Sequence, residues 1–326
     1  MTRYLLSRFA QLAVVVFLVA TIAFFLIHRA PGDPFSAAIE DPDVTEAVRA
    51  HWREAYGLDK PLPEQFVRYV TSVVRGDLGW SISKQRYVAD VLRDALPNTL
   101  FLMSIALFAS FAVGIGLAVA QVLKPGSLTD RVIGALSLFL FSVPEFLFAL
   151  MLLVVFAYKF PSLHFPIGGM TDPVIYPSLG PIERIAHIAH HTILPATTLT
   201  LLFSAVVARY QRAALLDVLP SDFVKTARAK GLPERVIVRH HALRNALLPT
   251  ISLFGLAFPM LLTGAVFVEK VFSWPGMGSV IVGSIDTRDY PLLMSAVIVG
   301  SILVAVGSLL ADLLYLAADP RLRDDR

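Results

Sequence analysis

The chain has 326 residues, of which 56% are hydrophobic, and its mean hydropathy of +0.67 is more than a soluble domain can bury. The formal net charge is only +3, and the cations gather in a few segments, so the composition argues against a nucleic-acid-binding protein. There is no cysteine, which excludes disulfides, thiol catalysis and cysteine-based metal sites. These features predict an all-α membrane protein.

The first apolar segment begins after two arginines and is long enough to cross a bilayer. Residues 9–27 are predominantly apolar. A spanning helix needs ~20 such residues, whereas the apolar region of a signal peptide has roughly 7–15. We therefore expect residues 1–29 to form a cytoplasmic N-terminus and an uncleaved first span.

Residues 30–97 are polar and acidic on balance, and we expect them to form an external helical subdomain. Three short helices are predicted by caps and apolar periodicity. The first runs from the capping-box pair Asp43 and Glu46 to Gly57, and the second covers residues 63–75 and ends at Gly76. Four residues predict one face of the second helix: Phe66, Val70, Val73 and Val74. Four others predict the face of the third helix: Val88, Val91, Leu92 and Ala95.

Residues 98–326 are expected to form the core, with five further spans. These lie at about residues 98–122, 132–158, 192–208, 248–268 and 291–317. Six spans place both termini in the cytosol, in agreement with the positive charge of the short inner loops. In the second span two rows of small residues predict close packing against a helix or a subunit. The rows are Ser110, Gly114 and Ala118, and Ala112, Gly116 and Ala120.

Two polar features interrupt this core. Pro144 predicts a kink in the third span, and Glu145 beside it is expected in the outer half of the membrane. Its carboxyl is either a lining group of a translocation path or a structural group at the kink. Further along, His187, His190 and His191 have a spacing that places them on one helical face. A weak metal-site hypothesis follows, and hydrogen bonding at the membrane interface is the favoured alternative.

Residues 209–249 are the most basic stretch, with eight Lys or Arg against three acids, and they are therefore expected in the cytosol. Pro220, a cap at Ser221 or Asp222, and a stop at Gly231 predict a short helix over residues 223–230. A second helix is predicted after Pro233, and its apolar stripe is Val236, Ile237, His240, Leu243 and Leu247. The segment is either a loop that only sets topology or a docking surface for a soluble partner, and two capped helices favour docking.

Residues 225–231, KTARAKG, resemble the EAA loop of ATP-binding-cassette importer permeases. The form TARAKGL followed by RHHALRNALLP is typical of the dipeptide and oligopeptide branch, as are APGDP, YGLDKPLPEQFVRYV, RGDLGWSIS, LPNTL, VFSWPGMG and RDYP. Three departures from the general pattern occur. Lys225 stands where a glutamate is usual, Thr226 stands where the first alanine is, and Leu248-Pro249 comes later than the usual Leu-Pro pair.

The resemblance implies a six-helix permease subunit in a bacterial cytoplasmic membrane that forms a path for peptides by alternating access. It implies that residues 222–231 contact an ATPase: Asp222, Phe223, Lys225, Thr226, Ala227, Arg228, Ala229, Lys230 and Gly231. The implied partners are a homologous permease, two ATPase subunits or domains, an external substrate-binding protein and membrane lipid.

No phosphate-binding G-x-x-x-x-G-K-[ST] loop occurs in the sequence, so ATP and Mg²⁺ are expected in the partners, and this chain is expected to be non-catalytic with no cofactor. An ion-gradient-driven secondary transporter is the alternative class, and nickel, glutathione or oligosaccharide is the alternative cargo. A membrane-embedded hydrolase lacks an evident nucleophile and base in this sequence.

Overall fold

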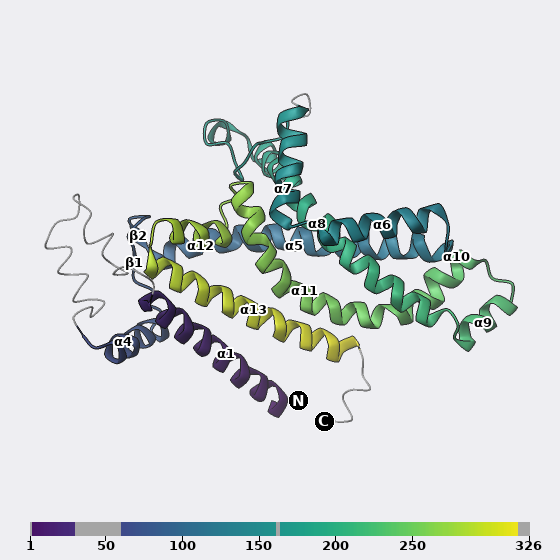
Figure 1. Cartoon of the computed structure of the whole chain (residues 1–326), viewed down its shortest axis with the longest axis horizontal. Helices are drawn as coiled ribbons and strands as arrows, with labels where there is room; N and C mark the ends of the chain where they lie inside the picture. The colour runs from purple at the N-terminus through teal and green to yellow at the C-terminus, as the bar shows by residue number, and fades with distance from the viewer. Residues whose placement is uncertain (1, 30–59, 161–163, 319–326) are drawn as a thin grey trace. The chain divides into compact units, whose positions relative to one another are not determined.

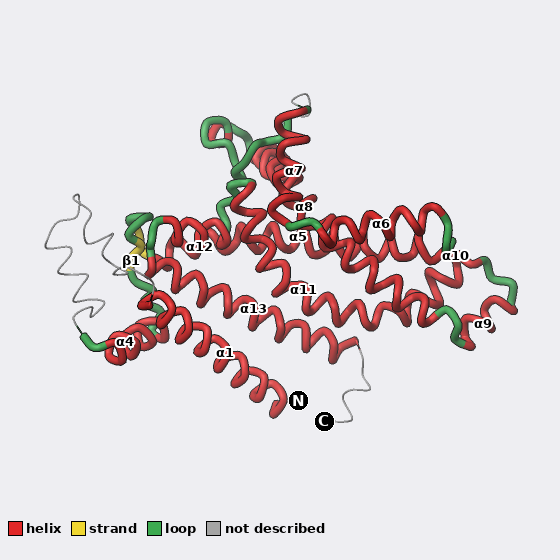
Figure 2. Tube along the Cα trace, in the orientation of Figure 1, coloured by secondary structure: helices red, strands yellow, loops and turns green. Residues whose placement is uncertain are grey.

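The computed structural model describes residues 2–29, 60–160 and 164–318, and these residues are helical almost throughout (Figures 1 and 2). The described strands are β1 (Trp80–Ser81) and β2 (Arg86–Tyr87), which pair antiparallel with Trp80 opposite Tyr87. The chain divides into two compact units. The first comprises residues 1–99 and 275–305, and the second comprises residues 100–274 and 306–326.

In the first unit, aromatic side chains join α1 (Thr2–Arg29) to α4 (Leu62–Val74). The ring of Phe24 lies 5.3 Å from that of Phe66 and 5.5 Å from that of Tyr69. The predicted helix over residues 63–75 is confirmed, and Gly76 ends it with a φ of 79°. Val74 was wrongly placed on its apolar face, because that side chain is 81% exposed. The helix predicted to end at Gly57 lies outside the described residues.

The core of the first unit is built by the start of α5 (Val88–Leu123), α12 (Met277–Asp286) and the start of α13 (Tyr290–Ala318). The predicted face of residues 88–95 is buried there, together with Met277 and Leu292. Asp289 lies directly before α13 and ties the β-hairpin to that helix. Its carboxylate accepts hydrogen bonds from Ser81 Oγ at 2.6 Å and from Ser83 Oγ at 2.7 Å.

The predicted third helix and second span are one helix, α5, which passes through Pro97 without a break. Proline was wrongly taken as a boundary. It removes one backbone donor, and the cost is tolerated where neighbouring groups supply other hydrogen bonds. Beside the proline, the side-chain amide of Asn98 adds two hydrogen bonds, because Nδ2 donates to the carbonyl of Asp94 at 3.2 Å and to that of Pro275 at 2.8 Å.

The second unit contains the remaining helices in chain order. They are the end of α5, α6 (Leu128–Ser142), α7 (Glu145–Leu153), the π-helical η1 (Val154–Lys159), the 3₁₀ turn η3 (Tyr176–Ser178), α8 (Pro181–Val218), α9 (Asp222–Ala229), α10 (Glu234–Val236), the π-helical η4 (Ile237–Ala242) and α11 (Leu243–Val271). Helix α8 passes through Pro195 and is longer at both ends than the predicted span over residues 192–208. It begins at Pro181 because the Glu183 carboxylate accepts the Gly180 N–H at 2.8 Å as a cap.

The predicted third span is broken rather than kinked. Helix α6 and the α7–η1 segment meet at an angle of 107°. Val143 and Pro144 are both extended, with ψ of 129° and 136°. The residue before a proline avoids the helical region of backbone conformation. Val143 and Pro144 therefore both leave the helical conformation, and the chain changes direction between α6 and α7. Glu145 therefore begins a new helix, and its expected position in the outer half of the membrane stays a prediction.

One of the two predicted rows of small residues is a helix contact. Ser110, Gly114 and Ala118 of α5 are buried, and a Cβ at Gly114 would lie 2.6 Å from Val207 Cβ of α8. In the other row Ala112 and Gly116 are exposed, and a Cβ at Gly116 would meet nothing within 4 Å. The first row therefore lets α5 and α8 approach closely.

Among the described residues, four helices are long and apolar enough to cross a membrane. They are Leu6–Arg29, Val88–Leu123, Pro181–Val218 and Tyr290–Leu310. The broken pair of α6 and α7–η1 is a fifth candidate. The span predicted at residues 248–268 falls within the 29-residue helix α11, which also passes through Pro249. The structure is thus that of a helical membrane protein, and the arrangement of six spans stays a prediction.

Candidate functional site

Helix α9 is the centre of the candidate site, and it confirms the short helix predicted over residues 223–230. Its apolar side is narrow. Val224 is fully buried and Ala227 is 5% exposed, and they pack among the ends of α5, α8 and η4. The buried cluster contains Ala118, Val119, Val122, Leu215, Val224, Ala227, Ile237, Val238, Ala242 and Ala246. Helix α9 is therefore fixed to the helical bundle through two small contacts.

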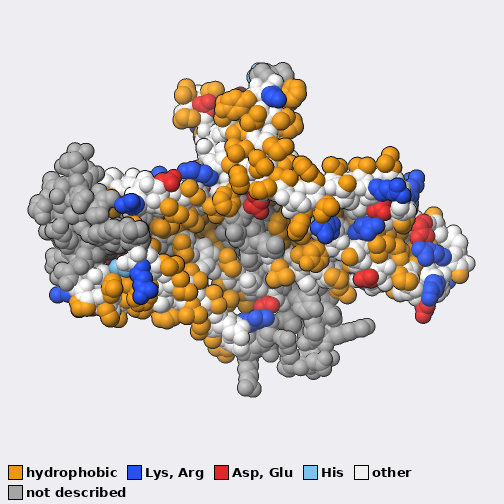
Figure 3. Space-filling model, viewed as in Figure 1, with side chains coloured by type: hydrophobic (Ala, Val, Ile, Leu, Met, Phe, Trp, Pro, Cys, Tyr) orange, Lys and Arg blue, Asp and Glu red, His pale blue; other side chains and the backbone are white. Residues whose placement is uncertain are grey.

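The rest of α9 faces away from the bundle. The exposed residues of the predicted ATPase-contacting set are Asp222, Phe223, Lys225, Thr226, Arg228, Ala229, Lys230 and Gly231. Phe223 is 44% exposed, so part of its ring is accessible to another surface. Ala227, which belongs to the same predicted set, packs inward and is 5% exposed. Charged side chains gather at this end of the second unit in Figure 3.

Gly231 closes α9 with a geometry that suits glycine. Its φ is 75°, in the left-handed region. The Leu232 N–H donates to the Ala227 carbonyl at 3.4 Å, and the Gly231 N–H donates to the Arg228 carbonyl at 2.9 Å. These two bonds form a Schellman cap, which satisfies carbonyls that the helix end would leave free. The predicted stop is confirmed, with its mechanism.

An ion pair holds α9 against α10 across this turn. Arg228 Nη2 and Nε donate to the two oxygens of Glu234 at 2.6 Å and 3.1 Å. This hydrogen bonding lowers the pKa of Glu234 from its ordinary value and raises the pKa of Arg228. The sequence reading missed the pair, because a spacing of six residues matches no helical neighbour and becomes a contact only through the turn at Gly231.

The predicted apolar stripe of the second helix was partly wrong. Ile237 is buried as expected, but His240 is exposed, and Val238, Ala242 and Ala246 are buried instead. The cause is the π-helical segment η4, in which a turn holds more residues than the 3.6 of an α-helix, so the buried face shifts along the sequence. The helix also runs through Leu243 into α11 rather than ending near Pro249.

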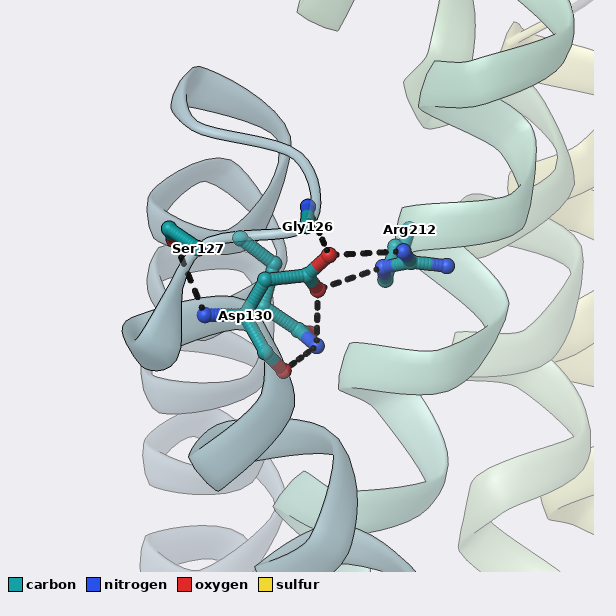
Figure 4. Close-up of polar contacts among 5 residues, drawn as sticks. Gly126, Ser127, Asp130 and Arg212 are labelled. Atoms are coloured by element: carbon teal, nitrogen blue, oxygen red, sulfur yellow. Dashed lines mark hydrogen bonds and ion pairs between the residues drawn. The ribbon is translucent and has the colours of Figure 1, made fainter.

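A polar node beside the buried cluster joins α5, α6 and α8 (Figure 4). The carboxylate of Asp130 is 8% exposed and accepts Arg212 Nε at 3.1 Å and Nη2 at 3.0 Å. It also accepts the Gly126 N–H at 3.0 Å and Gln121 Nε2 at 3.0 Å. Ser127 caps the same turn by accepting the Asp130 N–H. The sequence reading missed this node because its two charges lie 82 residues apart.

The neighbouring residue on α8 makes a second polar contact, with α11. Gln211 is fully buried, and its Nε2 donates to the Ala246 carbonyl at 3.0 Å. Thr250 Oγ1 donates in turn to Gln211 Oε1. Buried amides are stabilising only when they are satisfied in this way. Consecutive residues of α8 therefore tie it to α11 and to α6.

Glu145 and the three histidines lie elsewhere in the second unit. Glu145 is half-buried in the first turn of α7, and no hydrogen bond or ion pair joins it to another described residue. His187 Nε2 accepts the Asp172 N–H at 3.0 Å, and His191 Nδ1 donates to the Gly169 carbonyl at 2.9 Å. The described part of the chain holds no group of three His, Asp or Glu side chains placed to bind a metal. His187 and His191 thus fasten the loop before α8.

Residues 111–324 match the family model described as "Binding-protein-dependent transport system inner membrane component", and residues 1–103 match the N-terminal model of the same components. The chain belongs to this family. The oligopeptide transport system permease protein AppB of Bacillus subtilis is 36% identical over 323 residues, which are 99% of each chain. The glutathione transport system permease protein GsiC of Salmonella paratyphi A is 34% identical, and so is that of Escherichia coli O6:H1, each over 323 residues and 99% of both chains. This inner membrane component therefore resembles these permeases along its whole length.

Proposed function

We propose that the chain is the permease subunit of an ATP-binding-cassette importer that carries peptides across the cytoplasmic membrane of a bacterium. Membership of the binding-protein-dependent transport family and full-length similarity to an oligopeptide permease protein support this function. The similarity to glutathione permease proteins keeps glutathione, itself a short peptide, within the proposed cargo class.

The exposed face of α9 is the observation that supports coupling to the ATPase subunits. It combines a partly exposed aromatic ring, Phe223, with a row of charges, and its buried side chains, Val224 and Ala227, pack it against the bundle. A short amphipathic helix of this kind fits a groove on a soluble partner. Closure of that partner would then move the bundle through the buried cluster.

The proposed assembly contains this chain, a homologous permease, two ATPase subunits or domains and an external binding protein. ATP and Mg²⁺ are bound by the ATPases, and this chain takes no part in the chemistry of hydrolysis. The proposed topology has six spans with both termini in the cytosol. Residues 30–97 lie outside in that topology, and residues 209–249 lie inside. Glu145 is proposed to line the path, since an ionisable group in a span commonly faces a cavity.

Reconstitution with the partner subunits tests the proposed coupling surface. Arg228→Glu and Gly231→Asp are expected to lower ATP-dependent uptake strongly while the permease remains in the membrane. Arg228→Glu places a like charge beside Glu234, and Gly231→Asp strains the Schellman cap. Arg75→Glu, at the residue that follows α4, is the matched control, because it reverses an exposed charge in the other unit and is expected to leave ATPase co-purification unchanged.

A normal rate of ATP-dependent uptake in both α9 variants would show that this surface does not couple transport to the ATPase. Uptake by the purified chain alone under an ion gradient, without any ATPase, would instead support a secondary transporter. Such transporters commonly hold paired ionisable residues at mid-membrane.

A further inference from the structure

The polar node around Asp130 links the end of the molecule that carries α9 to the break between α6 and α7. Resting on the proposed function, we infer that the Arg212–Asp130 pair is the positioning link that carries movement of α9 to α6. Through α6, that movement reaches the Val143–Pro144 break and the first turn of α7.

The first step runs from α9 to α8. Leu215 of α8 is fully buried in the cluster that receives Val224 and Ala227 of α9. Interiors packed in this way transmit displacement because they have few voids to absorb it. A shift of α9 therefore moves the end of α8.

The second step runs from α8 to α6. Arg212 lies three residues before Leu215, and its two N–H groups bind both oxygens of Asp130. A bidentate pair fixes direction as well as distance. Among the residues of α6, only Asp130 and Ser137 are buried, so this pair anchors one of the two buried positions of that helix. Gln211 ties α8 to α11 instead, and it supplies no second polar route to α6.

The third step runs along α6. The helix continues to Ser142 and ends at the extended pair Val143 and Pro144, beyond which Glu145 opens α7. A rotation applied at Asp130 thus changes the angle at which α6 meets α7. In this way the Asp130 node connects α9, the proposed ATPase contact, to Glu145, the residue proposed to line the path.

Removal of Arg212 need not unfold the turn. The Asp130 carboxylate would keep its bonds from Gly126 and Gln121, and Ser127 would still cap α6. We expect Arg212→Met to lower cargo uptake per ATP hydrolysed by about fivefold to tenfold, a range that mutations between coupled sites produce. ATPase co-purification should stay close to wild type, whereas the melting temperature should fall, because the Asp130 carboxylate is 8% exposed and loses its charged partner. Arg212→Lys, which keeps the charge, should recover part of the loss.

The matched control is Arg68→Met on α4. It removes an exposed ion pair in which Arg68 Nη2 lies 3.0 Å from Glu64 Oε1, and it should not change uptake per ATP. Wild-type uptake per ATP in both Arg212→Met and Asp130→Asn would overturn the inference while leaving the proposed function intact. A parallel loss of uptake, ATPase binding and stability that Arg212→Lys does not relieve would show a merely structural role, and would also overturn it.

A distance measurement tests the link without any transport assay. The chain has no cysteine, so nitroxide labels can be placed at Thr226→Cys on α9 and Leu136→Cys on the exposed side of α6. We expect one narrow distance distribution in the otherwise wild-type permease and a broad one after Arg212→Met. An unchanged width would refute the link even if the proposed transport function failed for other reasons.

Discussion

Two residues, Gly231 and Glu234, determine how α9 ends and how it is held against α10. Gly231 allows the chain to turn back after a helix of 8 residues, and Glu234 then pairs with Arg228 from the far side of the turn. The role of Gly231 as a helix stop could be predicted from the sequence, because a glycine directly after a basic helix end is a local signal. The ion pair could not, because it depends on the path of the turn.

Replacing Gly231 by alanine should destabilise the protein. A side chain in the left-handed region costs roughly 1–2 kcal/mol, and part of this is offset by the lower entropy of the unfolded chain. We expect a net loss of about 1 kcal/mol, seen as a lower melting temperature in detergent. Gly283→Ala in α12 is the control, since it lies in a helix with nothing within 4 Å and should not lower the melting temperature. Equal melting temperatures for the two variants would contradict this account.

The Arg228–Glu234 pair should make the α9–α10 turn sensitive to acid. The pKa of folded Glu234 lies below its ordinary value of 4.5, so the stabilisation is complete above that value and is lost as the pH falls through the lowered pKa. For an exposed pair the effect is on the order of 0.2–1 kcal/mol. Hydrogen exchange of the Gly231 amide, corrected for its intrinsic rate, should lose protection in this acidic range. Glu234→Gln should show weaker protection that does not change with pH.

At the scale of elements, periodicity predicted where helices form better than where they end. The face of residues 88–95 was predicted correctly, because burial of apolar residues at helical spacing is a local property. Pro97 was wrongly taken as a boundary, because it lies inside α5. Neighbouring helices and side chains can satisfy the carbonyl that a proline leaves free, and no local pattern reveals those neighbours. The π-helical turn of η4 escaped prediction for the same reason.

The close approach of α5 and α8 should make Gly114 intolerant of even a methyl group. Gly114→Ala would place a carbon 2.6 Å from Val207 Cβ and 2.9 Å from the Ser204 carbonyl oxygen. Overpacking of this kind typically costs about 1–3 kcal/mol. Thermal unfolding should show the loss, whereas Gly116→Ala on the open face of α5 should be neutral or slightly stabilising. A destabilised Gly116→Ala with an unaffected Gly114→Ala would contradict the assigned contact.

For the whole molecule, the topology can be read by chemical labelling, because the chain contains no cysteine to remove. We expect Thr226→Cys on α9 to react with an impermeant thiol reagent only from the cytosolic side. Val174→Cys, at a residue that is 83% exposed before α8, should react only from the outside. Six spans with both termini inside require this pair of results. Labelling of Thr226→Cys from the outer surface would overturn both the topology and the proposed contact with the ATPase.

The break at Val143 and Pro144 also limits what can surround it. Where α6 stops and α7 starts, the last carbonyls and the first amides of two helices lack their usual partners. Hydrocarbon offers none, so irregular backbone at membrane depth is found only beside protein or in a water-filled space. In the proposed topology the bend therefore excludes lipid tails from its immediate surroundings: water or protein must surround that corner of the chain.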